Sequence, residues 1–343
     1  MGLGLLLVIV GGIMEGAYSI PLKYAPKWEW ENMWGAGSLM ALILVPWPLA
    51  FLTVPNLLSV LSATSAKSLL TTLLFGAGWG VGGVFFGLGI SALGLSLGLS
   101  LIMGLVAIGG SIVPLMMKYP EQLVRPAGLV LMAGIVVMLF GLAACARAGQ
   151  LKDKSAGLSE PAASGGPPRK VSFKLGLVFC IASGITSALV NFALIFGHEI
   201  ADAAVRRGAS LSNANNAIWV LVFTSNYVVN AAYCVYLAKK RHSFTKFFSG
   251  GLGSYWAAAV YLGIFWAAGI VVYGAGATRM GQFGAFLGYP VMLIVSILTG
   301  NGLGVLTGEW QEVPSRPKHI MTFGVSLLMS AIVILALSSW LIS

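Results

Sequence analysis

Glu15 is the residue whose position points most clearly to chemistry. It lies in the segment GGIMEGAYSIPLK (residues 11–23), inside the first apolar run, and it is the only acidic residue among residues 1–28. A carboxyl group at membrane depth is costly and usually marks a proton path or a substrate site. On a helix, Tyr18 and Ser19 follow three and four residues later and share its face. We therefore expect Glu15 to bind a proton, with Tyr18 and Ser19 as polar neighbours.

Neutral polar and aromatic side chains in later apolar runs form a second group of candidates. Asn226, Asn230 and Tyr233 fall at helical spacing and line one face of their run. Amides donate and accept hydrogen bonds with hydroxyls, and aromatic rings pack against the apolar faces of a sugar. As a set they favour a cavity for a neutral hydroxylated solute, although interhelical bonding or an aromatic belt explains any single member equally well. The expected substrate-binding residues are Glu15, Tyr18, Ser19, Trp79, Asn191, Asn226, Asn230, Tyr233, Trp266, Tyr273 and Gln282.

The composition indicates which elements hold these residues. Of the 343 residues, 58% are hydrophobic and only 9% are charged, whereas a soluble domain carries roughly 25% charged residues. Runs of about 20 apolar residues, enough to cross roughly 30 Å of hydrocarbon, recur along the chain without the alternation of a membrane barrel. We expect an all-α integral membrane protein with ten spans, at residues 2–21, 34–53, 68–90, 95–117, 126–146, 174–196, 214–238, 254–277, 281–307 and 318–340.

Several other classes of function are disfavoured by the sequence. No nucleophile is paired with a base at membrane depth, and no GxxxxGK[ST] phosphate loop is present. Cys145, Cys180 and Cys234 have neither metal-site spacing nor the pattern of a disulfide framework. We expect no enzymatic activity, no cofactor and no metal. The net charge of +10 lies mostly in loops, where it sets membrane orientation, and it does not indicate nucleic-acid binding.

The loops predict the orientation and the division of the chain. If the N-terminus is outside, most of the 20 Lys and Arg residues fall on the inside, which favours both termini outside. Residues 147–173 are rich in Ser, Ala, Gly and Pro, so we expect a flexible cytoplasmic linker there. This linker separates a first five-helix repeat at 1–146 from a second at 174–343.

The two halves begin alike. LGLLLVIVGGI (3–13) and LGLVFCIASGI (175–185) align without gaps, and Ser187 then takes the position of Glu15. Because each half has an odd number of spans, the halves must lie in opposite orientations. That is the inverted-repeat arrangement of secondary transporters, which places the binding site near the membrane midplane.

Residues 20–34, IPLKYAPKWEWENMW, resemble the L-rhamnose–proton symporter family of the drug/metabolite transporter superfamily. The likeness continues in order through FGAGWGVG (75–82), LGLSLG (93–98), RAGQLKDK (147–154) and GEWQEVPSRP (308–317). It implies ten helices in two inverted five-helix repeats and proton-coupled uptake of a deoxy-hexose such as L-rhamnose. The cavity residues that it implies are Trp79, Asn230, Trp266 and Tyr273. The inside gate that it implies consists of Lys23, Trp28, Trp30, Glu31 and Trp34.

Glu15 departs from that family, whose typical members have a small residue at this position. Glu15 followed by Lys23 also resembles the first helix of small multidrug-resistance exporters, in which the glutamate binds protons and cationic drugs alternately. Two functions stay open: proton-coupled sugar uptake by alternating access, and proton-coupled export of small organic cations with Glu15 as the shared site. The expected partners are a sugar, a proton (with Na⁺ as the alternative ion) and the lipids of a bacterial inner membrane. The sequence leaves monomer and homodimer open.

Overall fold

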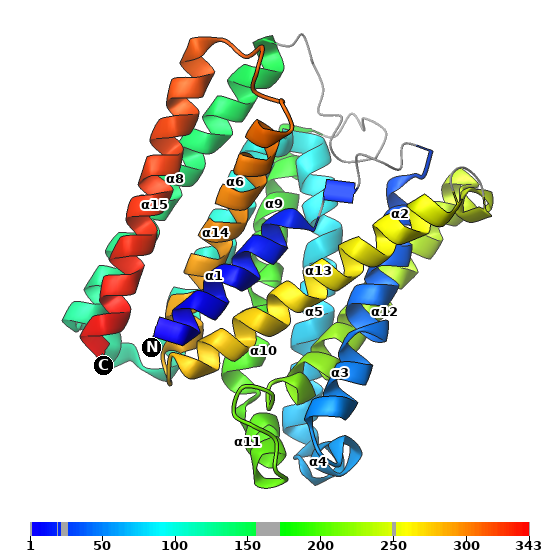
Figure 1. Ribbon diagram of the computed structural model, residues 1–343, viewed down its shortest axis with the longest axis vertical. Coiled ribbons are helices and arrows are strands. Elements are labelled where there is room, and N and C mark those ends of the chain that lie inside the picture. Colours follow the sequence, from blue (N-terminus) through cyan, green and yellow to red (C-terminus); the bar gives the residue numbers. More distant parts are fainter. Residues whose placement is uncertain (1, 19, 22–26, 156–171, 249–251, 343) are drawn as a thin grey trace.

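All regular secondary structure in the described part of the chain is helical (Figure 1). The computed structural model describes residues 2–18, 20–21, 27–155, 172–248 and 252–342. Within them, nine helices are long and apolar enough to cross a membrane, and Gly2–Ala17 forms a shorter apolar helix. Helices satisfy their backbone hydrogen bonds internally, as hydrocarbon requires. For these residues, an all-helical chain suited to multiple membrane crossings agrees with the prediction.

The helix bounds follow the expected spans closely, apart from the first, fifth and sixth spans. The helices of residues 2–155 are α1 (Gly2–Ala17), α2 (Trp30–Leu39), η2 (Met40–Leu44), α3 (Pro46–Thr53), α4 (Leu57–Ala63), α5 (Ala66–Leu93), α6 (Leu95–Ala107), η3 (Ile108–Ile112), α7 (Val113–Lys118), η4 (Pro120–Val124) and α8 (Pro126–Ser155). Those of residues 172–342 are α9 (Phe173–Ser187), α10 (Leu189–Phe196), α11 (His198–Arg206), α12 (Asn216–Arg241), η5 (Phe244–Phe248), α13 (Leu252–Arg279), α14 (Gly284–Leu306) and α15 (Ser315–Ile342).

Prolines explain two interruptions within spans. The π-helical turns η2 and η3 immediately precede the helices that carry Pro46 and Pro114 in their first turn. Proline lacks a backbone N–H and its ring clashes with the preceding turn of a helix. A wider π-helical turn accommodates that loss. The chain therefore crosses as α2–η2–α3 and as α6–η3–α7.

The first helix is shorter than the sequence suggested. We expected a span over 2–21, but α1 ends at Ala17, so Glu15 lies in its last turn. The side chain is nevertheless deep in the molecule, because Glu15 contacts Gly269, near the middle of α13. The glycine next to it, Gly16, packs against the middle of α14. A helix that ends at the mid-height of its neighbours is the kind of interruption that lines transporter binding sites.

Two other spans also differ from expectation. α8 continues to Ser155, into the range expected for the flexible linker, and residues 156–171 of that linker lie outside the described residues. The sixth span extends through α10 into α11, which reaches Arg206. The backbone N–H and hydroxyl of Ser65, which precedes α5, both donate to the Glu199 carboxylate of α11, each at 2.8 Å. These polar contacts tie α11 to the start of α5.

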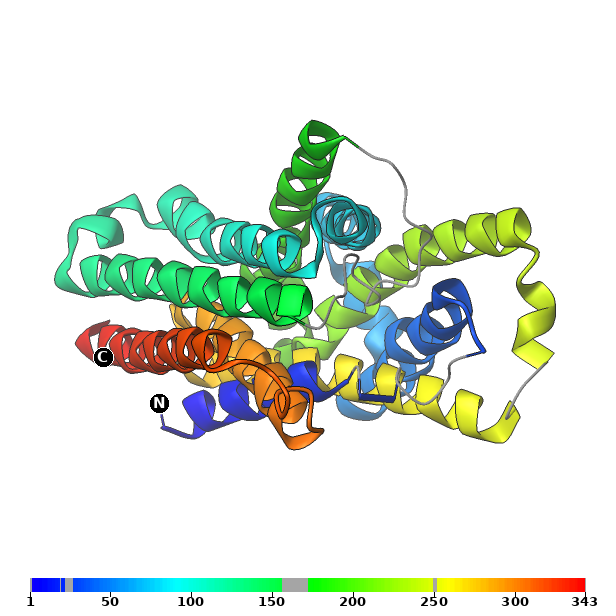
Figure 2. The same ribbon diagram turned by 90° about the horizontal axis from the view of Figure 1, so that it is seen from above.

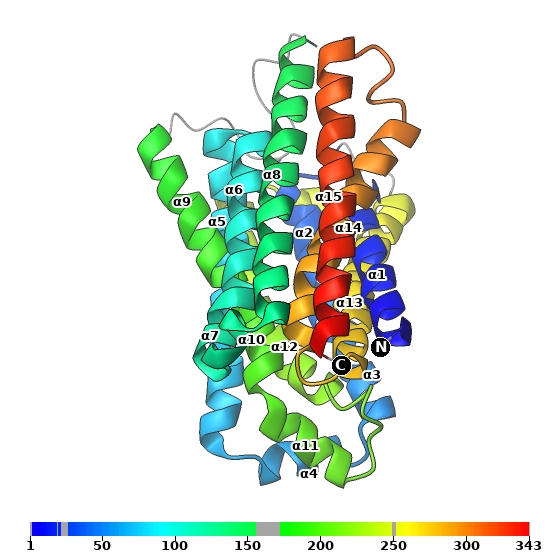
Figure 3. The same cartoon turned by 90° about the vertical axis from the view of Figure 1, so that its left-hand side faces the viewer.

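Packing places α1 against α13 and α14, and α9 against α5 and α6. α8 and α15 run side by side along one edge of the molecule (Figures 1 and 3), and Figure 2 shows the same pair from above. The helices approach closely where glycines face their neighbours. At Gly11, for example, an added Cβ would lie only 2.7 Å from the Gly269 carbonyl oxygen. Small residues at such crossings allow close contact between helices in lipid.

Candidate functional site

Glu15 provides the acidic group of the site. Its side chain is half-buried, but its Oε1 atom is buried and has no hydrogen-bond partner among the described residues. A Cβ placed on Gly269 would lie 3.0 Å from both Cγ and Oε1 of Glu15. Gly16, the residue after Glu15, packs against Ser296 and Thr299 of α14. The acid is therefore held between α13 and α14 rather than directed toward a loop.

Tryptophan rings form the aromatic part of the site. Trp79 of α5 and Trp266 of α13 stack with ring centroids 5.1 Å apart and planes at 17°. Phe223 of α12 packs against both rings. Trp266 lies three residues before Gly269, and therefore on the same face of α13, one turn from the glycine that Glu15 contacts. The acid and the aromatic rings are thus neighbours along α13.

Amide groups join the rings on the side of α2 and α12. Trp34 Nε1 donates to Asn230 Oδ1 at 2.7 Å, and its ring meets Trp266 edge to face. Asn230 Nδ2 donates in turn to Asn226 Oδ1 at 2.6 Å. Both asparagines are buried. The structure therefore brings together four of the expected substrate-binding residues, together with Trp34.

Tyr233 and Trp30 extend this cluster toward the start of α2. Trp30 stacks on Trp34 with centroids 6.1 Å apart, and it meets Tyr233 of α12 edge to face, also at 6.1 Å. Trp30, expected as a gate residue, is therefore continuous with the expected substrate residues. We call Trp34, Trp79, Asn226, Asn230 and Trp266 the aromatic–amide cluster.

Asn191 and Tyr273 form a separate polar group closer to the start of α14. The Tyr273 hydroxyl donates to Asn191 Oδ1, and Asn191 Nδ2 donates to the carbonyl oxygens of Gly110 and Ala285. Both side chains are buried. Their hydrogen bonds are made within the protein, so in this conformation they join η3, α10, α13 and α14. We refer to Asn191, Tyr273, Gly110 and Ala285 as the polar seal.

The other expected site residues lie elsewhere. Gln282 is exposed in the connection between α13 and α14, away from the aromatic–amide cluster. Ser19 and Lys23 lie outside the described residues. Tyr18 is half-buried directly after α1 and stays close to Glu15.

The remaining gate residues tie the start of α2 to the end of α12. Glu31 is only 1% exposed, and its two oxygens accept from Arg241 Nη1 at 2.8 Å and Ser243 Oγ at 2.7 Å. Trp28 packs edge to face against Phe247 and Trp256. Removing one partner of a buried ion pair costs about 3–5 kcal/mol. Glu31 therefore fixes this end of α2 firmly in the present conformation.

Sequence reasoning missed Tyr289 and gave Trp34 no contact with substrate. Trp34 could have been found, because it closes the motif KWEWENMW (27–34). Tyr289 carried no such signal, since it stands between a glycine and a proline in an apolar run. Only the packing of α13 against α14 brings its ring to Tyr273, with centroids 5.7 Å apart.

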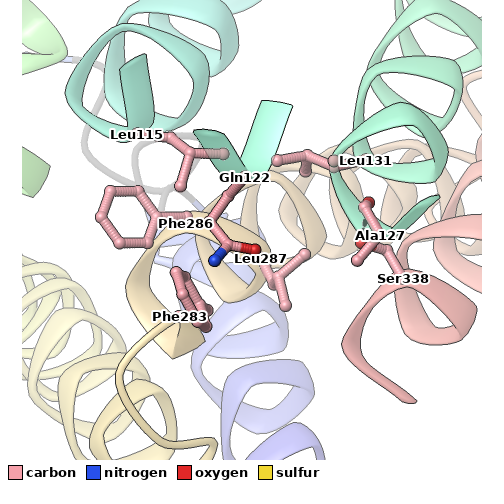
Figure 4. Close-up of a pocket in the computed structure, with 9 residues that line it drawn as sticks. Leu115, Gln122, Ala127, Leu131, Phe283, Phe286, Leu287 and Ser338 are labelled. Carbon is pink, nitrogen blue, oxygen red and sulfur yellow. Dashed lines mark hydrogen bonds between the residues drawn. The ribbon is translucent and has the colours of Figure 1, made fainter. Parts of the chain in front are cut away.

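A small pocket lies between α7, η4, α8, the start of α14 and α15 (Figure 4). Its lining is mainly apolar, with Leu115, Leu131, Phe283 and Phe286 around it. None of the expected substrate-binding residues lines it. It therefore contributes nothing to the site built around Glu15.

Apolar helices around an acid and an aromatic–amide cluster at mid-height define a membrane transport protein rather than an enzyme. The family model described as L-rhamnose-proton symport protein matches residues 1–339, and the chain belongs to this family. Its relatives include the L-rhamnose-proton symporter of Escherichia coli O1:K1 / APEC, which is 26% identical over 336 residues, covering 96% of this chain and 95% of the relative. The L-rhamnose-proton symporter of Yersinia pestis (strain Pestoides F) is 26% identical over 346 residues, with the same coverage of 96% and 95%.

Proposed function

We propose that this protein takes up a neutral sugar, such as L-rhamnose or a related deoxy-hexose, together with a proton by alternating access. Its family and its relatives support proton-coupled sugar transport. The observation that carries the proposal is the Glu15 carboxyl, whose Oε1 is buried without a partner in the described part of the chain. An ionisable group held in this way within a membrane protein is suited to carry the coupled proton.

The aromatic–amide cluster is the proposed sugar site. The Trp79 and Trp266 rings offer flat faces to the apolar side of a sugar, and the amides of Asn226 and Asn230 can exchange hydrogen bonds with its hydroxyls. In the present conformation Trp34 donates to Asn230. A sugar hydroxyl can replace that donor, which would link binding to movement of α2.

Coupling requires the proton and the sugar to favour the same conformation. A ligand shifts an equilibrium only through its different affinity for the two states. Glu15 takes up a proton from the outer side when the sugar binds, and it releases the proton on the inner side. Because Glu15 contacts α13 at Gly269, one turn from Trp266, one movement of that helix changes the surroundings of both residues.

The proposed architecture is two inverted five-helix repeats, and its first support is a pattern shared by α5 and α13. In one gap-free register six residues recur, among them Trp79, Gly82 and Gly89 in α5, which match Trp266, Gly269 and Gly276 in α13. Trp79 and Trp266 stack on each other, so two corresponding residues meet as a pair. A residue that touches its own counterpart is expected near a two-fold axis.

The second support is that corresponding contacts recur in the two halves. A Cβ at Gly12 would lie 2.8 Å from the Met292 carbonyl oxygen of α14. At Gly184, the counterpart of Gly12, it would lie 3.3 Å from the Ile102 carbonyl oxygen of α6. Met292 and Ile102 thereby correspond, which aligns α14 with α6. Repeated packing of this kind supports two copies of one unit.

Orientation and organisation complete the proposal. The ends of α8, α12 and α14 and the starts of α9, α13 and α15 lie together at one end of the molecule (Figure 1). That end carries most of the Lys and Arg residues, so we assign it to the cytoplasm. The first and last described residues lie at the opposite end (Figure 1), in keeping with both termini outside. The two repeats are proposed to comprise residues 1–146 and 174–343. The protein is placed in a bacterial inner membrane as a monomer or a homodimer, and Na⁺ is the alternative to the proton as the coupled ion.

Export of small organic cations finds no support in the comparisons. The family and the relatives carry the names of sugar–proton symporters. A thermal-shift screen on the purified protein separates the two functions. We expect L-rhamnose to stabilise the protein and quaternary ammonium compounds to leave its unfolding temperature unchanged.

The central test replaces Glu15 by Gln. The protein is reconstituted in vesicles that hold a pH-sensitive dye, and external L-rhamnose is added. We expect the wild type to carry protons inward with the sugar, whereas Glu15→Gln moves none. Ser187→Ala, at the corresponding position of the other half, is the matched control and should behave as the wild type. Unaltered proton movement in Glu15→Gln would contradict the proposal.

A further inference from the structure

Trp219 of α12 carries a buried hydrogen-bond donor that the aromatic–amide cluster does not use. The residue is only 1% exposed, and its Nε1 has no hydrogen-bond partner among the described residues. By contrast, the indole of Trp47 donates through Nε1 to Thr224 Oγ1 at 3.0 Å. A buried indole N–H normally finds a partner. An acceptor for Trp219 is therefore expected from a ligand or from another conformation.

The position of Trp219 on α12 extends the proposed sugar site. Four residues follow one another at helical spacing and share one face of α12: Trp219, Phe223, Asn226 and Asn230. The Trp219 ring stacks on Phe223 with centroids 5.7 Å apart and planes at 17°. Phe223 in turn packs against Trp79 and Trp266. Trp219 is thus the next ring beyond the aromatic–amide cluster, toward the start of α12.

Gly274 of α13 covers the indole N–H in this conformation. A Cβ at Gly274 would lie 2.8 Å from Trp219 Nε1 and 3.0 Å from Cζ2, so the glycine allows α13 to lie directly on this edge of the ring. Asn215 holds the cover in place, because its Nδ2 donates to the Gly274 carbonyl oxygen at 3.2 Å and to Thr278 Oγ1 at 2.7 Å. These two bonds join the start of α12 to the end of α13.

The covered donor lies on the side from which the sugar enters. The start of α12 and the end of α13 lie away from the end of the molecule that we assign to the cytoplasm (Figure 1). Alternating access requires the outer side to open. Separation of α13 from α12 there breaks the bonds of Asn215 and uncovers Trp219 Nε1.

We propose that Trp219 is an outer substrate-binding residue, whose indole N–H donates to a hydroxyl oxygen of the entering sugar. This inference rests on the proposed function and on the orientation assigned above. One ring, that of Phe223, lies between Trp219 and Trp266. A hexose on the outer side of Trp266 is therefore within reach of the Trp219 donor. An indole N–H donates only, so this position selects a sugar that presents an oxygen there.

The first test compares Trp219→Phe with Trp47→Phe. Both variants remove an indole N–H beside α12, but that of Trp47 already has Thr224 as its acceptor. Calorimetric titration of the purified protein gives the affinity for L-rhamnose. We expect Trp219→Phe to bind about fivefold more weakly, because one hydrogen bond is lost, and Trp47→Phe to bind as the wild type. Unchanged affinity in Trp219→Phe would overturn the inference.

Derivatives of L-rhamnose that each lack one hydroxyl group separate the hydrogen bond from the packing of the ring. The derivative without the accepting hydroxyl has already lost the bond, so it should bind the wild type and Trp219→Phe equally well. The other derivatives should bind Trp219→Phe about fivefold more weakly than the wild type. The same loss for every derivative would overturn the inference, because it would reflect packing alone.

A second variant applies if Trp219→Phe does not fold. Replacement of Trp219 by benzothienylalanine keeps the two fused rings and exchanges the N–H for sulfur, so we expect the same loss of affinity. Wild-type affinity in that variant would overturn the inference. If the wild type itself bound no L-rhamnose, the proposed function would be refuted, and the inference with it.

Discussion

The packing of α1 on α13 closely resembles the packing of α9 on α5, yet the two contacts differ in chemistry. Glu15 meets Gly269 in the first, and Ser187 meets Gly82 in the second. The glycines allow the same close approach of helices in both places. The acid places an ionisable group in one contact, whereas a hydroxyl occupies the other. Similar backbones can therefore serve different roles when single side chains differ.

The contacts around these two positions differ as well. Ser183, which precedes Ser187 by one turn, donates its hydroxyl to the Gly82 carbonyl oxygen at 2.9 Å. The corresponding residue in α1 is Gly11, which has no side chain to donate. The contact of α9 with α5 is therefore fixed by a hydrogen bond that the contact of α1 with α13 lacks. We infer that α1 is the more mobile partner.

Exchanging the acid between the halves gives the largest expected effect. Glu15→Ser should lower L-rhamnose accumulation driven by a pH gradient on the order of 100-fold, the upper range of coupling between two sites. Adding Ser187→Glu should not restore it, because the hydrogen bond from Ser183 to Gly82 holds α9 on α5 and limits the movement of the new acid. Accumulation is measured with radiolabelled sugar in vesicles. Recovery in the double variant would show that the halves are interchangeable.

Replacing the two stacked tryptophans tests whether they share one role. Trp79→Leu and Trp266→Leu should each weaken L-rhamnose binding about fivefold, since each removes an aromatic face worth about 1 kcal/mol. Calorimetric titration of the purified protein gives the affinities. Trp47→Leu, on α3 outside the cluster, is the control and should bind normally. A large loss in only one of the two variants would argue against a symmetric sugar site.

Replacing Gly82 or Gly269 by alanine is expected to have the smallest effect. The resulting change in the free energy of unfolding shows which of the two helix contacts is packed more closely. A Cβ at Gly82 would lie 2.8 Å from the Ser187 backbone nitrogen, whereas at Gly269 its nearest contacts are at 3.0 Å. We expect Gly82→Ala to lower the free energy of unfolding by about 1–2 kcal/mol and Gly269→Ala to lower it less. Gly302→Ala has no atom within 4 Å and should stabilise by up to about 1 kcal/mol. Chemical unfolding in detergent measures all three, and equal losses at Gly82 and Gly269 would contradict this order.

Helical periodicity predicted much of the site but not its connections. Asn226 and Asn230 could be placed on one face because their spacing is helical, and the structure joins them by a hydrogen bond. Periodicity does not say which helix that face meets, so the bond from Trp34 could not be foreseen. For the same reason the sequence did not show that the Asn191 amide joins groups from three distant segments, and its role in substrate binding stays a prediction.

The sequence by itself determined that the chain is helical and apolar along its length, because hydrocarbon leaves a backbone no other partner than itself. It also singled out Glu15, since one carboxyl in an apolar run needs a reason. Only the tertiary structure decided that α1 stops at Ala17, at the mid-height of α13 and α14. It alone placed the Tyr289 ring against Tyr273 of the polar seal, with ring centroids 5.7 Å apart. Contacts between helices depend on how their faces meet in three dimensions, and a single sequence records only the faces.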